Sequence, residues 1–133
     1  MQEQRSNHRR RKANRLEVKK AQKLGKVRSS WNRISARKSR EVVNLIRGKH
    51  VNEAIGILRT CTRKAAVPTL KALKSAMANA HENHKMELDR LYVAKAFVEE
   101  GPTLRRMLPR ARGRADRIRK RTSHTVIVLA ERS

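Results

Sequence analysis

The chain has 133 residues, which is enough for one domain with a single modest core and leaves no room for a separate catalytic domain. Its 35 Lys and Arg residues outnumber 11 Asp and Glu residues, so the net charge is +24 and a polyanion is the natural partner. The longest apolar run, Val126 to Ala130, is far too short to cross a bilayer, and the basic stretches lack an apolar face for binding a membrane surface. We therefore expect a soluble, intracellular protein that binds nucleic acid. The single Cys61 cannot form an internal disulfide, which agrees with a reducing compartment.

The positive charge is concentrated at the two ends of the chain. Residues 1–40 carry a net charge of +13, residues 41–100 carry +3, and residues 101–133 carry +8. This distribution predicts an ordinary domain with two cationic arms. We divide the chain into a basic N-terminal extension at 1–26 and one nucleic-acid-binding domain at 27–133, whose own extension spans about 101–124.

Two helices are expected in the first half of the domain. Ser35 can cap the first helix, which has an apolar stripe at Val42, Leu45 and Ile46 and ends near Gly48. The second covers about Val51 to Arg59 and places Ala54, Ile55 and Leu58 on one face. Gly56 weakens this second helix by about 1 kcal/mol relative to Ala, so the helix needs packing to persist.

A third, longer helix should follow. Thr62 can cap it, and the pattern carries it to about Asn83. Its inward face would consist of Ala66, Leu70, Leu73, Met77 and Ala80. Pro68 lies inside this range and should bend the early part of the helix, because proline removes a backbone donor.

After the third helix the periodicity changes to that of strands. Leu91, Val93 and Phe97 alternate with Tyr92, Ala94, Ala96 and Val98, and Thr125 to Leu129 form a β-branched apolar run. If Val98 pairs with Val126, the connecting turn centres near Arg112 and Gly113, where Gly113 can supply a positive φ.

The segment between these strands predicts a long β-hairpin. Each arm would extend about ten residues, or roughly 33 Å, beyond the sheet. An isolated two-stranded ribbon is marginal in water, and Pro102 and Pro109 cannot donate to its ladder, so the extension needs a partner. Its many arginines indicate that the partner is rich in phosphate.

Recognition is expected to use the nucleic-acid backbone and its shape. The chain has one Trp, one Tyr and one Phe, spaced too far apart in sequence for a local stacking motif. It also has no zinc-finger spacing and no basic-zipper heptad.

Three other readings of the sequence are weaker. His81 and His84 could share a metal ion on one helix side, but the sequence offers no nearby further ligands, and Cys61 lies at the helix's far end. Glu99 with Glu100, or His124 with Asp116, could act as acid and base, but neither pair has a nucleophile or an apolar pocket. We therefore expect no catalytic residue, no metal and no cofactor. The sequence also allows a DNA-bending protein with basic β-arms. Competition binding between duplex DNA and folded RNA would distinguish such a protein from an RNA-binding one.

Three stretches of the chain resemble one known family: NRISARKSREVVNLIRGKHVNEAIGIL, SAMANAHENH and FVEEGPTLRRMLPRARGRADRIRKRTSHTVIVL. They are similar to large-subunit ribosomal protein twenty-two of the bacterial type, over about Val27 to Glu131. The resemblance implies an α+β fold in which three helices pack on a three-stranded antiparallel sheet with a long protruding basic β-hairpin. It places the first strand near Val27 to Arg33. The chain departs from the family at Ala36, where Pro is usual, and at Pro68, where a helix former is usual.

The resemblance also implies a function. It describes a structural constituent of the large ribosomal subunit that binds 23S-type rRNA, supports assembly and lines the peptide exit tunnel with its hairpin tip. Further partners would be neighbouring large-subunit proteins and the nascent peptide, with no membrane and no homo-oligomer. The location would be the cytoplasmic ribosome, with an organellar ribosome left open.

Candidate contact residues follow from the same positions. Those expected to bind rRNA in the domain and hairpin are Arg33, Arg37, Lys38, Arg105, Arg106, Arg117, Arg119, Lys120 and Arg121. Those expected to line the tunnel are Arg110, Ala111, Arg112, Gly113 and Arg114. The resemblance does not cover the N-terminal extension, but its basic run of Arg9, Arg10, Arg11 and Lys12 is also expected to contact RNA; the alternative is a disordered solubilising tail.

Overall fold

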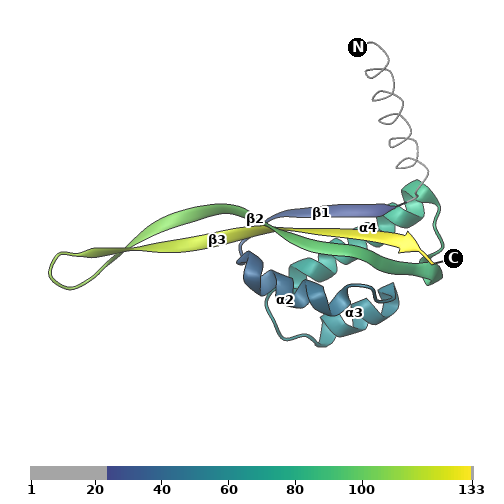
Figure 1. The fold of residues 1–133 in the computed structure, drawn as a ribbon, viewed down its shortest axis with the longest axis horizontal. Helices are drawn as coiled ribbons and strands as arrows, with labels where there is room; N and C mark the ends of the chain where they lie inside the picture. The colour runs from purple at the N-terminus through teal and green to yellow at the C-terminus, as the bar shows by residue number, and fades with distance from the viewer. Residues whose placement is uncertain (1–23, 133) are drawn as a thin grey trace, which may run out of the picture.

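The structure is a computed structural model that describes residues 24–132, and over this range three helices pack on one side of a three-stranded antiparallel sheet (Figure 1). The elements are β1 (Gly25–Asn32), α2 (Ala36–Ile46), α3 (Val51–Thr60), α4 (Ala66–His84), a 3-10 turn (Leu88–Arg90), β2 (Leu91–Pro109) and β3 (Ala115–Glu131). The sheet order is β1-β3-β2, so the last strand lies in the centre and pairs antiparallel with both others. The predicted α+β class is confirmed.

The core lies between the sheet and the helices. α4 packs against β1 and β3, while α2 packs against β2. Ile46, Leu73, Leu91, Ile127 and Leu129 are all fully buried there. Burial of such side chains stabilises the fold by about 1.5–3 kcal/mol each. The stability of the protein therefore resides in this body and not in the hairpin.

The first helix begins and ends where the sequence predicts. α2 follows Ser35 and stops just before Gly48, whose φ of +75° ends the helix and whose N–H donates to the Val93 carbonyl at 2.9 Å. Within the predicted stripe, Val42 and Ile46 are buried, but Leu45 was wrongly assigned to the core and is 46% exposed. The second helix also matches its expected range, with His50 as its N-cap.

The third helix starts later than predicted. Its N-cap is Ala65 and not Thr62, because a short loop separates it from α3. Pro68 therefore lies in the first turn, where backbone N–H groups have no helical acceptor, so proline removes no hydrogen bond there. The helix extends to His84, one residue past the expected end, and Lys85 closes it in the left-handed conformation. On the predicted inward face, Ala66, Leu73 and Ala80 are buried, whereas Leu70 and Met77 are partly buried.

A β-bulge in β2 corrects the predicted alternation. Pairing with β3 shifts between Val93 and Lys95, so Ala94 is an extra residue. Beyond the bulge, Ala96 and Val98 face the core, and Phe97 lies on the opposite face with 41% of its surface exposed. The same shift places Val98 opposite Thr125, one residue away from the predicted partner Val126.

Figure 1 shows the hairpin projecting well past the helices. β1 pairs with β3 only as far as Ser123. Beyond that point the sheet has two strands, β2 and β3, which pair from Thr103 opposite Arg121 to Pro109 opposite Ala115. The turn is where the sequence predicts it, and Arg112 and Gly113 both have positive φ, of 57° and 67°. These are the φ signs of a type I′ turn, in which the Arg114 N–H donates to the Ala111 carbonyl at 3.4 Å.

Candidate nucleic-acid interface

Two grooves flank the base of the hairpin, where it leaves the body. The larger groove has a volume of about 1020 Å³ and runs between the hairpin and the starts of α2 and α4. Its lining residues are Arg33, Ile34, Ser35, Lys38, Glu41, Arg63, Lys64, Ala65, Leu104, Arg106, Arg119, Lys120, Arg121 and Thr122. Eight of these are Lys or Arg, and Glu41 alone is acidic.

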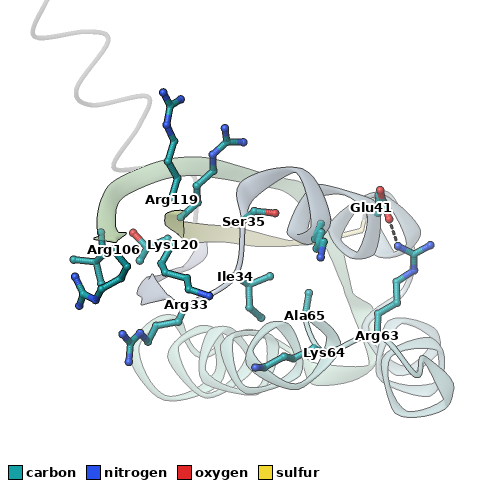
Figure 2. A pocket seen from close by; sticks show the side chains of 14 residues that line it. Arg33, Ile34, Ser35, Glu41, Arg63, Lys64, Ala65, Arg106, Arg119 and Lys120 are labelled. Carbon is teal, nitrogen blue, oxygen red and sulfur yellow. Dashed lines mark hydrogen bonds and ion pairs between the residues drawn. The ribbon is translucent and has the colours of Figure 1, made fainter. Parts of the chain in front are cut away.

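The charges of the larger groove are arranged at two ends. Figure 2 shows Arg33, Arg106 and Lys120 gathered at one end, while Arg63 lies at the other and forms an ion pair with Glu41. Among the described residues, the one acidic side chain of the groove is thus already neutralised. The remaining guanidinium and ammonium groups line a groove that is wide enough to admit several phosphate groups.

The smaller groove, of about 440 Å³, lies beside the first turn of α2. Its basic residues are Arg37, Arg105, Arg119 and Arg121. Arg119 and Arg121 line both grooves, so the two grooves form one continuous basic surface around the hairpin base. We call this surface the hairpin-base surface.

Hydrogen bonds fix α2 and the hairpin relative to each other. The hydroxyls of Ser39 and Ser123 lie 3.3 Å apart in a buried position. At the other end of α2, the Arg47 guanidinium donates to the Ala96 carbonyl at 2.7 Å. A helix bound at both ends to the sheet holds its exposed basic residues in a constant position, and such preorganisation lowers the entropic cost of binding.

The structure brings together most of the predicted contact residues. Arg33, Lys38, Arg106, Arg119, Lys120 and Arg121 line the larger groove, and Arg37 and Arg105 line the smaller one. Arg117 lines neither groove and lies one ladder step further out, opposite Met107. The predicted residues Arg9, Arg10, Arg11 and Lys12 lie outside the described residues.

Two basic residues of the larger groove were missed by sequence reasoning. Arg63 and Lys64 belong to the short loop between α3 and α4, inside the stretch that is nearly balanced in charge. Only the packing of α4 against the sheet brings this loop to the hairpin. In the sequence, only the fact that these two basic residues are consecutive could have suggested a contact with nucleic acid.

The hairpin tip is a compact turn with three arginines. The Arg110 N–H donates to the Arg114 carbonyl at 2.8 Å, and the Arg110 side chain forms an ion pair of 2.8 Å with Asp116. Arg112 and Arg114 make no ion pair with any described residue. The tip therefore presents two free guanidinium groups at the end of a long arm.

The hairpin has no core of its own. From Thr103 to Arg121 every side chain is exposed apart from the partly buried Ile118, and Met107 is 64% exposed. A ribbon with so little apolar burial is held mainly by its ladder, and such a ribbon is only marginally stable in water by itself.

The competing sites do not form in the described part of the chain. His81 contacts the Met86 carbonyl through Nδ1 at 3.4 Å, and no group of three or more candidate metal ligands is present among residues 24–132. His124 is buried against Trp31, whereas Asp116 lies eight residues away along β3 beside Arg110. No helix in this range is long and apolar enough to cross a membrane.

Comparison with known proteins gives a consistent result. The chain matches the family described as ribosomal protein L22p/L17e over residues 27–130. It is 60% identical to the large ribosomal subunit protein uL22 of Thermoanaerobacter sp. (strain X514), covering 75% of this chain and 90% of the relative. It is 58% identical to that of Carboxydothermus hydrogenoformans, covering 78% and 92%, and 55% identical to that of Thermus thermophilus, covering 80% and 95%. The chain therefore belongs to the ribosomal protein L22p/L17e family, a family of structural, non-enzymatic components of the ribosome.

Proposed function

We propose that this protein is a structural constituent of the large ribosomal subunit that binds large-subunit rRNA through its hairpin-base surface. The observation that carries the proposal is the convergence of four chain segments on that surface. The segments are the β1–α2 loop, the start of α2, the α3–α4 loop and the hairpin. Together they supply ten basic residues against two acidic ones, Glu41 and Glu100.

The geometry favours a folded RNA over an extended single strand at this surface. Cations on a helix, a loop and a ribbon surround one space, so phosphates from different parts of a folded backbone can be bound at once. An extended single strand of RNA would contact the cations on only one side of this space. The relatives' name as large ribosomal subunit proteins agrees with rRNA as this folded partner.

We extend the proposal to the hairpin tip. The arm of about ten residues can carry Arg112 and Arg114 roughly 30 Å from the body, into the interior of a large RNA. Family membership supports placing this tip at the wall of the peptide exit tunnel, beside the nascent peptide. The neighbouring partners would then be other large-subunit proteins around the body.

Binding to a 23S rRNA fragment at several salt concentrations tests the proposal. Arg119→Gln with Lys120→Gln removes two charges from the larger groove, so we expect affinity to fall and the slope of log K against log salt to decrease by about 1–2. Lys71→Gln with Lys74→Gln is the matched control, because both lysines are exposed on α4 and line neither groove. Duplex DNA serves as competitor.

Two results would contradict the proposal. Equal losses in the groove variant and the α4 control would mean that binding reflects total charge only. Preference for duplex DNA over folded rRNA at the same salt would instead favour a DNA-bending protein.

A further inference from the structure

Among residues 24–132, no helix covers one of the two faces of the sheet. Ile127 and Leu129 of β3 point into the core, so the alternate residues Val126 and Val128 point to the other side, which we call the open face. On this face Lys26 and Lys95 flank Val128, Arg28 and Phe97 flank Val126, and His124 lies opposite Glu99. Figure 1 shows all three helices on the opposite side of the sheet.

The fold brings two aromatic rings to the open face although they are distant in sequence. Trp31 makes an edge-to-face contact with His124, with ring centroids 5.5 Å apart and an interplanar angle of 86°. Phe97 lies on the same face, diagonal to His124 along the ladder. Trp31 and Phe97 are 65% and 41% exposed, which is unusual for the two most apolar aromatic side chains.

Trp31 is held outward by an unfavourable backbone. Its φ of 60° lies in the left-handed region, which a bulky residue adopts only when its surroundings impose it. The pairing of β1 with β3 shifts between Ser29 and Asn32, so Trp31 belongs to a bulge. Its backbone N–H donates to His124 Nδ1 at 3.0 Å, which fixes the bulge in place.

The geometry of the ring pair leaves room for a ligand. An edge-to-face contact with His124 covers at most one face of the indole, so at least one indole face is free of it. The cations of the open face are Arg28, which lies opposite Val126, and Lys26 and Lys95, which lie opposite Val128. The carboxylate on this face, Glu99, is paired with Arg28 at 2.9 Å. The open face thus combines a flat apolar ring with net positive charge.

We propose that the open face is a second RNA site, at which an unpaired nucleotide stacks on Trp31 and the phosphates of the same strand are bound by Arg28 and, further along the sheet, by Lys26 and Lys95. A flanking base can reach Phe97. Every nucleobase has a π-face, so this stacking selects for unpaired RNA and not for a particular base. The proposal rests on the proposed function, because it assumes an RNA partner, and it adds a single-strand site to the folded-RNA surface.

The open face differs from the hairpin-base surface in a way that an experiment can detect. Trp31 is the only tryptophan of the chain, so its fluorescence reports on this face alone. We would titrate the full-length protein with a single-stranded oligoadenylate of about eight nucleotides and with an RNA duplex of equal length. Saturable quenching by the single strand, and much weaker quenching by the duplex, is the expected result.

Substitutions then test whether the ring contributes affinity. Trp31→Ala should weaken single-strand binding about 5- to 100-fold while duplex binding changes less than about 2-fold. Trp31→Tyr should retain most of the affinity, because it keeps an aromatic face. Leu45→Ala is the matched control, since Leu45 is an exposed apolar residue on α2, away from the open face. Circular dichroism would verify that each variant is folded.

The outcomes separate this inference from the function on which it rests. If Trp31 fluorescence does not respond to the oligoadenylate, or Trp31→Ala binds it normally, then the open face has another occupant and the inference is overturned. The groove variant Arg119→Gln/Lys120→Gln would still lose rRNA binding in that case. If the groove variant also binds rRNA normally, the proposed function fails as well.

Discussion

The side-chain oxygens of Ser39 in α2 and Ser123 in β3 lie 3.3 Å apart, and both residues are buried. This contact joins the helix that carries Arg37 to the strand that carries Arg121 at the point where the hairpin leaves the sheet. A buried hydroxyl that loses its partner destabilises a protein by about 1–3 kcal/mol.

We therefore predict that Ser39→Ala lowers the free energy of unfolding by at least about 1 kcal/mol, and that the double variant with Ser123→Ala loses less than the sum of the two single variants. Urea denaturation measures both quantities. Ser75→Ala, an exposed serine on α4, is the control and should be neutral or slightly stabilising. Additive losses would show that the two hydroxyls do not interact in solution.

Gly25 lets β1 approach α4 closely. A Cβ at this position would lie 2.6 Å from the Ala80 Cβ and 2.8 Å from the Ala76 carbonyl oxygen, so the strand or the helix would have to move. We predict that Gly25→Ala destabilises the protein by roughly 2 kcal/mol, in the range of overpacked cores. Gly56→Ala is the matched control, since nothing lies within 4 Å of its Cβ, and it should stabilise α3 by up to about 1 kcal/mol. Thermal unfolding would reveal opposite shifts in Tm, and equal shifts would contradict this account of Gly25.

The bulge at Ala94 determines which side chains of β2 hold the core. Val93 is fully buried, whereas Phe97 lies on the open face. We predict that Val93→Ala lowers stability by about 2–3 kcal/mol, and that Phe97→Ala lowers it by about 1 kcal/mol although more atoms are removed. Denaturant midpoints compare the two. A larger loss at Phe97 would place that ring in the core, as uninterrupted alternation predicts.

The same bulge shows where sequence reasoning ends. Periodicity found the three helices because each has an apolar stripe, and Gly113 identified the turn because a hairpin turn of this kind needs positive φ. The extra residue of the bulge has no comparable sequence pattern, because Ala94 is small enough to lie on either face of a strand. The predicted alternation therefore placed Phe97 on the same face as Leu91 and Val93, whereas Phe97 lies on the opposite face.

The candidate site was predictable only in part for a similar reason. Clustered charge identified the hairpin arginines, and the family resemblance identified the basic residues at the start of α2. The contribution of Arg63 and Lys64 depends on how α4 packs against β1 and β3, which local sequence does not encode. The approach of Trp31 to His124, 93 residues later, depends on strand order.

The hairpin tip should be mobile in the free protein and ordered on RNA. Its side chains are exposed and its free arginines repel one another, so little opposes the conformational entropy of the turn. We predict a low backbone order parameter for the Gly113 amide in the free chain and a value near that of rigid backbone in the rRNA complex. The Ile127 amide, in the buried part of β3, is the internal control and should be rigid in both states. A rigid Gly113 amide without RNA would refute this prediction.

The last prediction concerns the length of the hairpin. Met107 pairs with Arg117 and Leu108 pairs with Asp116, so deleting these four residues shortens both arms by two and joins two intact ladder pairs. The deletion removes about 7 Å of reach, leaves the net charge unchanged and keeps every remaining side chain on its original face. Because the core and the hairpin-base surface are untouched, we expect Tm to stay within a few degrees and rRNA-fragment affinity to change less than about 3-fold.

The same variant should still enter large subunits but alter the tunnel wall, because the tip no longer reaches its position. Chemical probing of tunnel nucleotides in assembled subunits would measure this change. A full-length control with polar substitutions at the same four positions keeps the reach, so a change seen only in the shortened chain must come from length. If the shortened chain fails to fold or to enter subunits, the outer hairpin is part of the fold or the main anchor. If the shortened hairpin leaves the tunnel RNA unchanged, the tip does not shape the tunnel wall. The surrounding RNA would hold the hairpin rigidly, so a displacement of the tip by this distance should otherwise alter the RNA that it contacts.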